Sequence, residues 1–425
     1  MTAPPVDTRP IVLWIHPGGL VPISGGGAAR TWALIAHLRA GGFAVHLVTG
    51  DHGEHNAGLE ALVDRLWIPG GAAPPSGRPA TKAALERTLK GLWRRLDPDL
   101  RAYRRLAARS NRPSASLNAL VRNRRPALEA FAGEIAYRIH PTAAIASYVW
   151  LAPALDRMPP GTLRLLDTID IQHVREETAR AAGGSLPHAR CARDDETREF
   201  GRADVLIAIQ AEEAAQIRAM RPDREVLVAG HALKPLPYKP SPAGSRELLY
   251  VGNRYDPNVI GLRTLLRDVW PAVRAACPDA ALTVCGRVAE TVRRAPEGVS
   301  LVGHTPDLNP YYARAAAVLN PVPYGTGLKI KTVEAMAHGR CVICTKAGAG
   351  GLGDPTELPI IVADPAADMA AAILGILRDT ARRHDLEQRA AACARERFHP
   401  DAAYGALVAR LETHVGGADQ SKRPS

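Results

Sequence analysis

The sequence predicts an α/β protein made of two domains, each with a doubly wound parallel sheet. Short apolar runs rich in β-branched residues alternate with helical stretches along the whole chain. The 425 residues exceed the roughly 250 to 300 at which a single core stops growing. A proline-rich segment at 234–245 separates two halves of this kind, so we expect it to be the linker.

Each half contributes its own set of strands. In the first half we expect strands at 11–16, 43–50, 143–150, 163–168, 203–210 and 225–230. In the second half we expect strands at 247–252, 281–286, 316–321, 341–345 and 358–363. Helical stretches follow from about 366 to 398, and His399 and Pro400 interrupt them.

These elements predict the domain boundaries. We expect an N-terminal domain at 1–235 and a C-terminal domain at 236–398. A C-terminal helix at 399–415 either stays with the second domain or crosses back to the first, and a disordered tail follows at 416–425.

The composition predicts a cytoplasmic protein. No stretch approaches the ~20 consecutive apolar residues of a membrane span, and the first residues lack the pattern of an export signal. The six cysteines are scattered over a long chain, so we expect them to be reduced. Cys341 and Cys344 form a C-x-x-C, but they lie in an apolar run typical of a buried strand, and no second ligand pair completes a zinc site.

The net charge of +11 is concentrated locally. Residues 82–109 contain nine basic and three acidic side chains, with leucines three or four residues apart as on one face of a helix. Two interpretations stay open: a pair of helices divided by Pro98 that bind an anionic membrane peripherally at its inner face, or helices packed on their own domain. The segment has no recognisable nucleic-acid-binding module, and we expect no nucleic-acid partner.

Two glycine-rich turns are candidate ligand sites. Gly25, Gly26 and Gly27 follow the first predicted strand and precede a helix, where backbone N–H groups can face a phosphate. Their spacing is not that of a dinucleotide fingerprint, so an ordinary strand-to-helix turn explains them as well.

The second turn, Gly325, Thr326 and Gly327, precedes the helix of KIKTVEAMAHG. Its amides and the helix dipole are suited to a diphosphate, and Lys329 and Lys331 add positive charge. Glu334 stands about one turn further on, where its carboxylate could accept both hydroxyls of a ribose. The alternative is a helix-stabilising acid with solvated lysines.

The C-terminal half resembles the family 4 (group 1) retaining glycosyltransferases, which have the GT-B fold of two Rossmann-like domains facing across a cleft. The resemblance rests on LLYVGNRYDPNVIGLRTLLRDVWPAV, LTVCGR, LVGHTPDLNPYYARAAAVLNP, GTGLKIKTVEAMAHG and CVICTKAGAGGL, in this order. It implies transfer of a sugar from a nucleotide-diphosphate sugar, bound as a co-substrate, with retention of configuration and with no metal or other cofactor.

The resemblance also assigns donor-site residues. The family's ribose-binding glutamate falls on Glu334, and its sugar-binding glutamate falls on Thr326, which is a departure. The basic pair at the diphosphate corresponds to Arg254 together with Arg287, Lys329 or Lys331. The loop of Gly303, His304 and Thr305 lies where relatives contact the base.

The first half resembles the acceptor domain of the same family in its glycine turn and in the segments ASYVWLAPAL, LLDTIDIQHVREE and ADVLIAIQAEEAAQI. Relatives often have His-Asp where this chain has Ile169 and Asp170. Asp170 and His173 at this strand end are candidate catalytic residues, with Arg254 and Lys331 on the donor side.

The sequence therefore predicts a hexosyltransferase-type enzyme of cell-surface polysaccharide or glycoconjugate biosynthesis. Its partners are the nucleotide-sugar donor and a saccharide, lipid-linked or other acceptor. Two alternatives remain. One is a sugar-nucleotide epimerase of the same architecture. The other is a catalytically silent nucleotide-binding or membrane-associated scaffold, which the departures from the family pattern at Thr326 and Ile169 favour.

Overall fold

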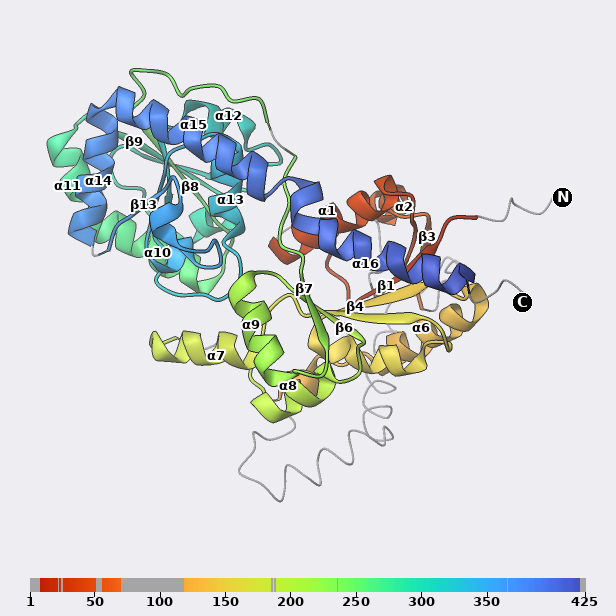
Figure 1. The fold of residues 1–425 in the computed structure, drawn as a ribbon. Coiled ribbons are helices and arrows are strands. Elements are labelled where there is room, and N and C mark those ends of the chain that lie inside the picture. The colour runs from red at the N-terminus through yellow and green to blue at the C-terminus, as the bar shows by residue number, and fades with distance from the viewer. Residues whose placement is uncertain are drawn as a thin grey trace, which may run out of the picture.

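The chain folds into two α/β domains that lie side by side (Figure 1). The computed structural model describes residues 8–21, 23, 26–50, 56–69, 118–184, 186, 189–234, 236–364 and 366–420. The basic segment 82–109 and Gly25 lie outside the described residues. Two parallel sheets with helices on both faces confirm the predicted fold class.

The N-terminal sheet has seven parallel strands in the order β3-β2-β1-β4-β5-β6-β7. Its strands are β1 (Ile11–His16), β2 (Ala44–Thr49), β3 (Arg65–Trp67), β4 (Ala143–Ser147), β5 (Leu163–Asp167), β6 (Val205–Ala208) and β7 (Glu225–Val228). Six of these confirm predicted strands. The edge strand β3 was not predicted, because three residues are too few to show a periodic pattern.

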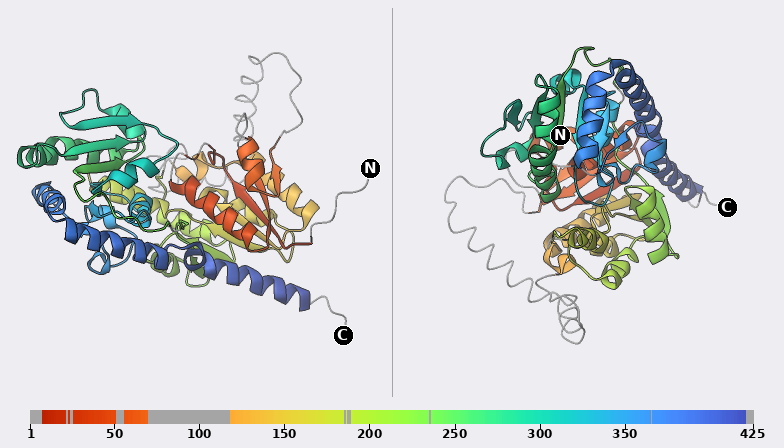
Figure 2. Two further views of the ribbon diagram at one scale, coloured as in Figure 1. Left: turned by 90° about the horizontal axis from the view of Figure 1, so that it is seen from above. Right: turned by 90° about the vertical axis from the view of Figure 1, so that its left-hand side faces the viewer.

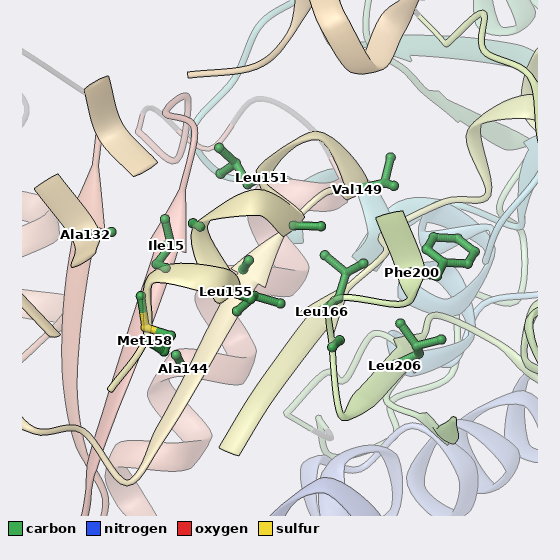
Figure 3. Packing of buried hydrophobic residues seen from close by; sticks show 14 of the residues in the cluster. Ile15, Ala132, Ala144, Val149, Leu151, Leu155, Met158, Leu166, Phe200 and Leu206 are labelled. Atoms are coloured by element: carbon green, nitrogen blue, oxygen red, sulfur yellow. The ribbon is translucent and has the colours of Figure 1, made fainter. Parts of the chain in front are cut away.

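Helices cover both faces of this sheet. They are α1 (Gly26–Ala40), α2 (Asn56–Leu62), α5 (Ala119–Arg122), α6 (Pro126–Ile139), α7 (Gln172–Ala181), α8 (Arg193–Phe200), α9 (Ala211–Met220) and the 3₁₀ helix η1 (Val149–Arg157). Leu13 and Ile15 of β1 face the core shared with α6 and η1, whereas Val12 and Trp14 face the core shared with α1. Figure 3 shows the first of these cores, in which Leu151 and Leu155 of η1 pack with strand residues.

The C-terminal sheet has six parallel strands in the order β10-β9-β8-β11-β12-β13. Its strands are β8 (Glu247–Val251), β9 (Ala281–Cys285), β10 (Val299–Gly303), β11 (Ala317–Asn320), β12 (Val342–Cys344) and β13 (Ile361–Val362). All but β10 confirm predicted strands. Cys341 and Cys344 are buried free thiols in this sheet, as expected from their apolar run.

The helices of the second domain lie on both faces of its sheet. They are α10 (Asp256–Thr264), α11 (Trp270–Ala276), α12 (Asn309–Arg314), α13 (Ile330–Ala337), α14 (Ala366–Arg378) and α15 (Thr380–Arg397), with short turns η2 (Leu265–Val269), η3 (Arg287–Thr291), η4 (Ala347–Ala349) and η5 (Pro355–Glu357). The linker packs on α15, where Ser241 N donates to the Glu387 carboxylate at 3.0 Å and Arg383 donates to the carbonyl of Ala243 at 2.8 Å.

Helix α16 (Pro400–Gln420) follows the second domain in sequence but packs on the first. Tyr404, Leu407 and Leu411 are buried in the core shared with α1, and the Tyr404 hydroxyl accepts a hydrogen bond from Ala232 N at 3.1 Å. Figure 2 shows α15 and α16 running along one side of both domains. The helix continues to Gln420, so residues 416–420, the described part of the predicted disordered tail, are helical.

Among the described residues, no helix is both long enough and apolar enough to cross a membrane.

Candidate functional site

The two domains touch where the strands of both sheets end. A parallel sheet places its ligand-binding loops at the carboxyl ends of its strands. The loops of the N-terminal sheet therefore meet those of the C-terminal sheet here. Thr326 Oγ1 of the second domain donates to Asp170 Oδ1 of the first at 3.2 Å. Beside this contact, Ile330 at the start of α13 lies against Gly26 at the start of α1, where a Cβ would come within 2.6 Å of Ile330 Cδ1.

The loop Gly325–Gly327, which we call the donor loop, has a conformation that requires glycine at its two ends. Gly325 has φ 143° and Gly327 has φ 70°. A Cβ at Gly327 would also lie 2.8 Å from Asp170 Oδ1. The glycines therefore allow both the turn and the close approach of the N-terminal domain.

Lys329 holds the donor loop from one side. Its Nζ donates to the carbonyl oxygens of Gly325, Thr326 and Gly327, each at 2.9 Å. In a trans peptide the N–H points away from the C=O of the same unit. The amides of residues 326, 327 and 328 are therefore directed away from Lys329, as an anion-binding loop requires.

The sequence suggested that Lys329 adds positive charge at a diphosphate. Its hydrogen bonds indicate instead that it orients the donor loop. Lys329 is 9% exposed, and its ammonium already donates to three carbonyls. Burial lowers its pKa to about 8, although Asp170 and Glu213 act in the opposite direction. Lys329 orients the loop, and a direct contact with a diphosphate would have to break these bonds.

Lys331 and Glu334 lie on α13, one turn apart. Lys331 Nζ donates to Asn258 Oδ1 at 2.6 Å and lies 5.4 Å from the centroid of the Tyr250 ring. Burial lowers the pKa of Lys331 to about 7, and Lys329 adds to this effect. Burial raises the pKa of Glu334 to about 7, against the opposing effect of Lys331.

The N-terminal domain brings a charged cluster to the donor loop. Arg175 Nη1 of α7 lies 3.3 Å from Asp170 Oδ2, and its guanidinium lies 5.9 Å from the centroid of Tyr255 in the other domain. Glu213 of α9 is 4% exposed, and a Cβ at Gly327 would lie 3.7 Å from its Oε1. Burial and the nearby Asp170 raise the pKa of Glu213 well above its usual range.

A buried ion pair between Arg30 and Asp167 lies next to this cluster. Arg30 of α1 donates from Nη1 to Asp167 Oδ2 at 2.7 Å, and both side chains are fully buried. Arg30 also donates from Nη2 to the Ala229 carbonyl at 2.5 Å. The pair ties the first helix to the ends of β5 and β7, and this fixes the loop that carries Asp170.

Other predicted residues lie apart from this centre. His173 Nδ1 lies 2.7 Å from Glu196 Oε2, and the ring lines a cavity of about 210 Å³ with Glu176, Glu177, Arg180, Arg190, Cys191 and Ala192. Glu196 also accepts hydrogen bonds from the amides of Gln172 and His173, so it caps α7.

The remaining donor-side candidates lie on loops after neighbouring strands. Arg254 is exposed after β8, and Arg287 is exposed after β9 with Glu290 at 3.8 Å. Gly286 N donates to the Gly303 carbonyl at 2.6 Å, which joins the loop of Arg287 to the loop of His304 and Thr305. Within the described part of the chain, neither arginine is hydrogen-bonded to the donor loop.

The sequence did not single out Arg175, Glu213, Tyr148 or Tyr255. Tyr148, Glu213 and Tyr255 lie within about five residues of a strand end, which is the one signal that could have indicated them, whereas Arg175 lies further along on α7. Charged residues at helix starts are common, so position alone does not separate these from solvated surface residues.

The described residues contain no group of three or more His, Cys, Asp or Glu side chains placed to hold a metal ion.

Comparison with solved structures identifies the fold. The chain has the fold of sucrose-phosphate synthase from Thermosynechococcus elongatus, with a TM-score of 0.67 at 17% identity over 97% of this chain and 100% of that one. Anabaena HepE in complex with UDP and glucose matches with a TM-score of 0.61 at 16% identity, over 95% of this chain and 99% of that one. TarM matches with a TM-score of 0.66 at 10% identity, over 95% of this chain and 99% of that one. The chain therefore has the two-domain GT-B fold that these proteins share.

A family model matches part of the second domain. Residues 245–379 match the family described as "Glycosyl transferases group 1". A relative from Klebsiella pneumoniae, "Uncharacterized 44.6 kDa protein in cps region", is 29% identical over 129 residues. That match spans 28% of this chain and 33% of the relative.

Proposed function

We propose that the chain transfers a sugar from a nucleotide-diphosphate sugar to a hydroxyl of an acceptor, with retention of configuration and without a metal ion. The observation that carries this proposal is the conformation of the donor loop, in which Lys329 Nζ donates to all three carbonyl oxygens of the loop. Its amides, the start of α13 and Lys331 would stabilise the diphosphate as it departs. The UDP and UDP-glucose complexes of HepE support a donor of this class.

Glu334 would bind the ribose in this arrangement. A carboxylate accepts hydrogen bonds from two vicinal hydroxyls, and Glu334 lies one turn into α13, the helix that follows the loop proposed to hold the phosphates. Arg254 and Arg287, on exposed loops at neighbouring strand ends, would approach the diphosphate when the donor binds. Gly303, His304 and Thr305 would face the base.

The transfer step needs no protein nucleophile. The bond from the anomeric carbon to the diphosphate oxygen breaks, the acceptor oxygen bonds to the same face, and its proton moves to the departing phosphate oxygen. Asp170 already contacts Arg175 and Thr326, which supports a role in positioning. Anomeric configuration of the product, read by proton NMR, tests retention, and turnover in EDTA tests independence from metal.

The relative in the cps region supports an acceptor in polysaccharide or glycoconjugate biosynthesis. The acceptor would then be a saccharide or a lipid-linked saccharide. Product analysis with a labelled donor separates transfer from isomerisation of the donor, which an epimerase would give, and from the unchanged donor that a silent scaffold would leave.

The donor site is tested first by a thermal-shift screen with UDP, GDP, ADP and dTDP and with UDP-glucose, GDP-mannose, ADP-glucose and dTDP-glucose. A true ligand raises the melting temperature by mass action. Absence of any shift across these eight compounds at millimolar concentration would contradict the proposed function.

Glu334→Gln then tests the site itself. Hydrogen bonds to a charged group contribute about 1.5 to 3 kcal/mol, so we expect the variant to bind the selected nucleoside diphosphate ~10- to 100-fold more weakly by calorimetry. Glu357→Gln is the matched control, because Glu357 is exposed on η5 of the same domain. Equal affinities of the two variants would remove Glu334 from the site.

A further inference from the structure

Tyr148, immediately after β4, has a backbone conformation that is normally restricted to glycine. Its φ is 68° and its ψ is 142°. Such a conformation is sterically unfavourable for a residue with a side chain and persists only where the surroundings enforce it. Here Tyr148 N donates to the Asp167 carbonyl at 2.8 Å, and the Tyr148 carbonyl accepts from Leu151 N at 3.0 Å.

The fold alone does not explain a tyrosine at this position. Glycine adopts the same conformation without the steric cost, so a residue with a side chain is retained here for what that side chain does. Strained residues of this kind cluster at functional sites.

The aromatic ring is held on two sides. The Trp150 ring stacks on it with the centroids 4.5 Å apart and an interplanar angle of 9°. The His16 ring, at the end of β1, lies 5.9 Å away and is tilted by 58°. The direction of the hydroxyl is therefore fixed by the backbone and by two neighbouring rings.

The hydroxyl lies at the gap between the domains. A Cβ at Gly27 would be 3.3 Å from Tyr148 Oη and 3.7 Å from Ile169 Cγ2, so the hydroxyl lies over the start of α1. Asp170 is close enough to influence Tyr148 electrostatically, and Asp170 contacts Thr326 of the donor loop. Burial and Asp170 raise the pKa of Tyr148 to about 12, so the group is a neutral hydroxyl that can donate at pH 7.

We propose that the Tyr148 hydroxyl binds a hydroxyl of the transferred sugar and so contributes to the choice of donor sugar. The inference rests on the proposed function, in which the donor loop holds the diphosphate. In a nucleotide-diphosphate sugar the sugar is attached to the distal phosphate. With the diphosphate at the donor loop, the sugar extends to the facing domain, where Asp170 and Tyr148 present polar groups.

The test compares two ligands on one variant. Tyr148→Phe removes the hydroxyl and keeps the ring stacked on Trp150. The ligands are the nucleoside diphosphate that the thermal-shift screen selects and the sugar nucleotide with the same base. Because a neutral hydrogen bond contributes about 0.5 to 1.5 kcal/mol, we expect sugar-nucleotide affinity to fall ~2- to 12-fold, with nucleoside-diphosphate affinity unchanged.

Tyr137→Phe is the control, since Tyr137 lies on α6 with 58% of its surface exposed. An equal loss for both ligands, or no loss for either, overturns the role of Tyr148. The nucleoside-diphosphate titration also reports that the variant is folded. Binding of no compound in the screen would instead contradict the proposed function, so the two failures are distinguishable.

A second measurement identifies the sugar hydroxyl. Wild-type protein is titrated with sugar nucleotides that each lack one hydroxyl. The analogue that lacks the partner of Tyr148 should bind wild type more weakly but bind Tyr148→Phe as well as the parent compound does. If Tyr148→Phe discriminates against every analogue as strongly as wild type does, the contact is not made.

Discussion

Burial brings two opposite charges on α13 to the same pKa. Lys331 and Glu334 are both shifted to about 7, the first downward from 10.5 and the second upward from 4.5. Each group is therefore only partly charged near neutral pH in the unliganded protein. In the proposed site, the diphosphate would need the charged form of Lys331 and the ribose would need the carboxylate form of Glu334. The affinity is therefore limited by Glu334 at low pH and by Lys331 at high pH.

Nucleoside-diphosphate affinity should therefore be highest near pH 7. Below it, Glu334 becomes protonated and the ribose contact weakens; above it, Lys331 loses its proton and the phosphate contact weakens. Each limb should approach a tenfold loss per pH unit, because one proton is linked to binding. Calorimetry between pH 5.5 and 8.5 measures this profile.

The variants separate the two limbs. Glu334→Gln should abolish the acidic limb, and Lys331→Met should abolish the alkaline limb. A flat profile in the wild-type protein would show that neither group titrates in the site.

At the scale of elements, α16 joins the N-terminal domain to the end of the chain. It contributes Tyr404, Leu407 and Leu411 to a core that also contains side chains of α1, α2 and the strands β1, β2, β4, β5 and β6. These side chains are at most 1% exposed, so the helix belongs to this core energetically although it follows the other domain.

Leu407→Ala should lower the free energy of unfolding by about 2 to 5 kcal/mol, because it leaves a cavity in that core. Urea denaturation followed by circular dichroism measures the change. Glu412→Ala on the exposed face of the same helix is the control, and we expect it to change stability by less than about 0.5 kcal/mol. Equal effects of the two substitutions would contradict the packing of α16.

At the scale of the whole molecule, the site is assembled by contact between domains. The donor loop meets Asp170, and Ile330 fills the space above Gly26. The contacting residues come from both sheets, so separation of the domains would divide the site. In the proposed transfer reaction, closure of this kind would exclude water and position the acceptor.

Gly26→Leu should hold the domains apart, since even a Cβ there lies 2.6 Å from Ile330 Cδ1. We expect sugar transfer to fall at least ~10-fold, as 1 Å displacements in a catalytic site can cost more than this. Affinity for the nucleoside diphosphate, which the second domain would bind, should be retained. Initial rates with a labelled donor and calorimetry measure the two effects.

The additional substitution Ile330→Ala removes the opposing side chain and should restore part of the transfer rate. If Gly26→Leu keeps full activity, the observed contact is not needed for transfer.

The sequence predicted the fold class and most strands because that information is local. The alternation of Val12, Leu13, Trp14 and Ile15 between two cores follows directly from the period of a strand, with both faces apolar because both are covered by helices. The strands β3 and β10 were not predicted, because these partly exposed strands lack a continuous apolar run.

The sequence could also indicate the donor loop and the helix with Lys331 and Glu334, because these residues are neighbours in the chain. It could not show that Lys329 turns back onto its own loop, since that depends on the path of the backbone through two glycines. It could not show that Arg175 and Glu213 accompany Asp170, because they come from different helices.

The sequence by itself determined two parallel sheets and their division near the proline-rich linker, and it indicated the segment that we propose for the diphosphate. Only the tertiary structure decided which N-terminal side chains face that segment, to which domain α16 belongs, and that Tyr148 is held in a glycine conformation at the gap. The physical reason is that periodicity and turn chemistry act between near neighbours in the chain. Contacts between strand ends of two domains depend on how whole sheets are placed.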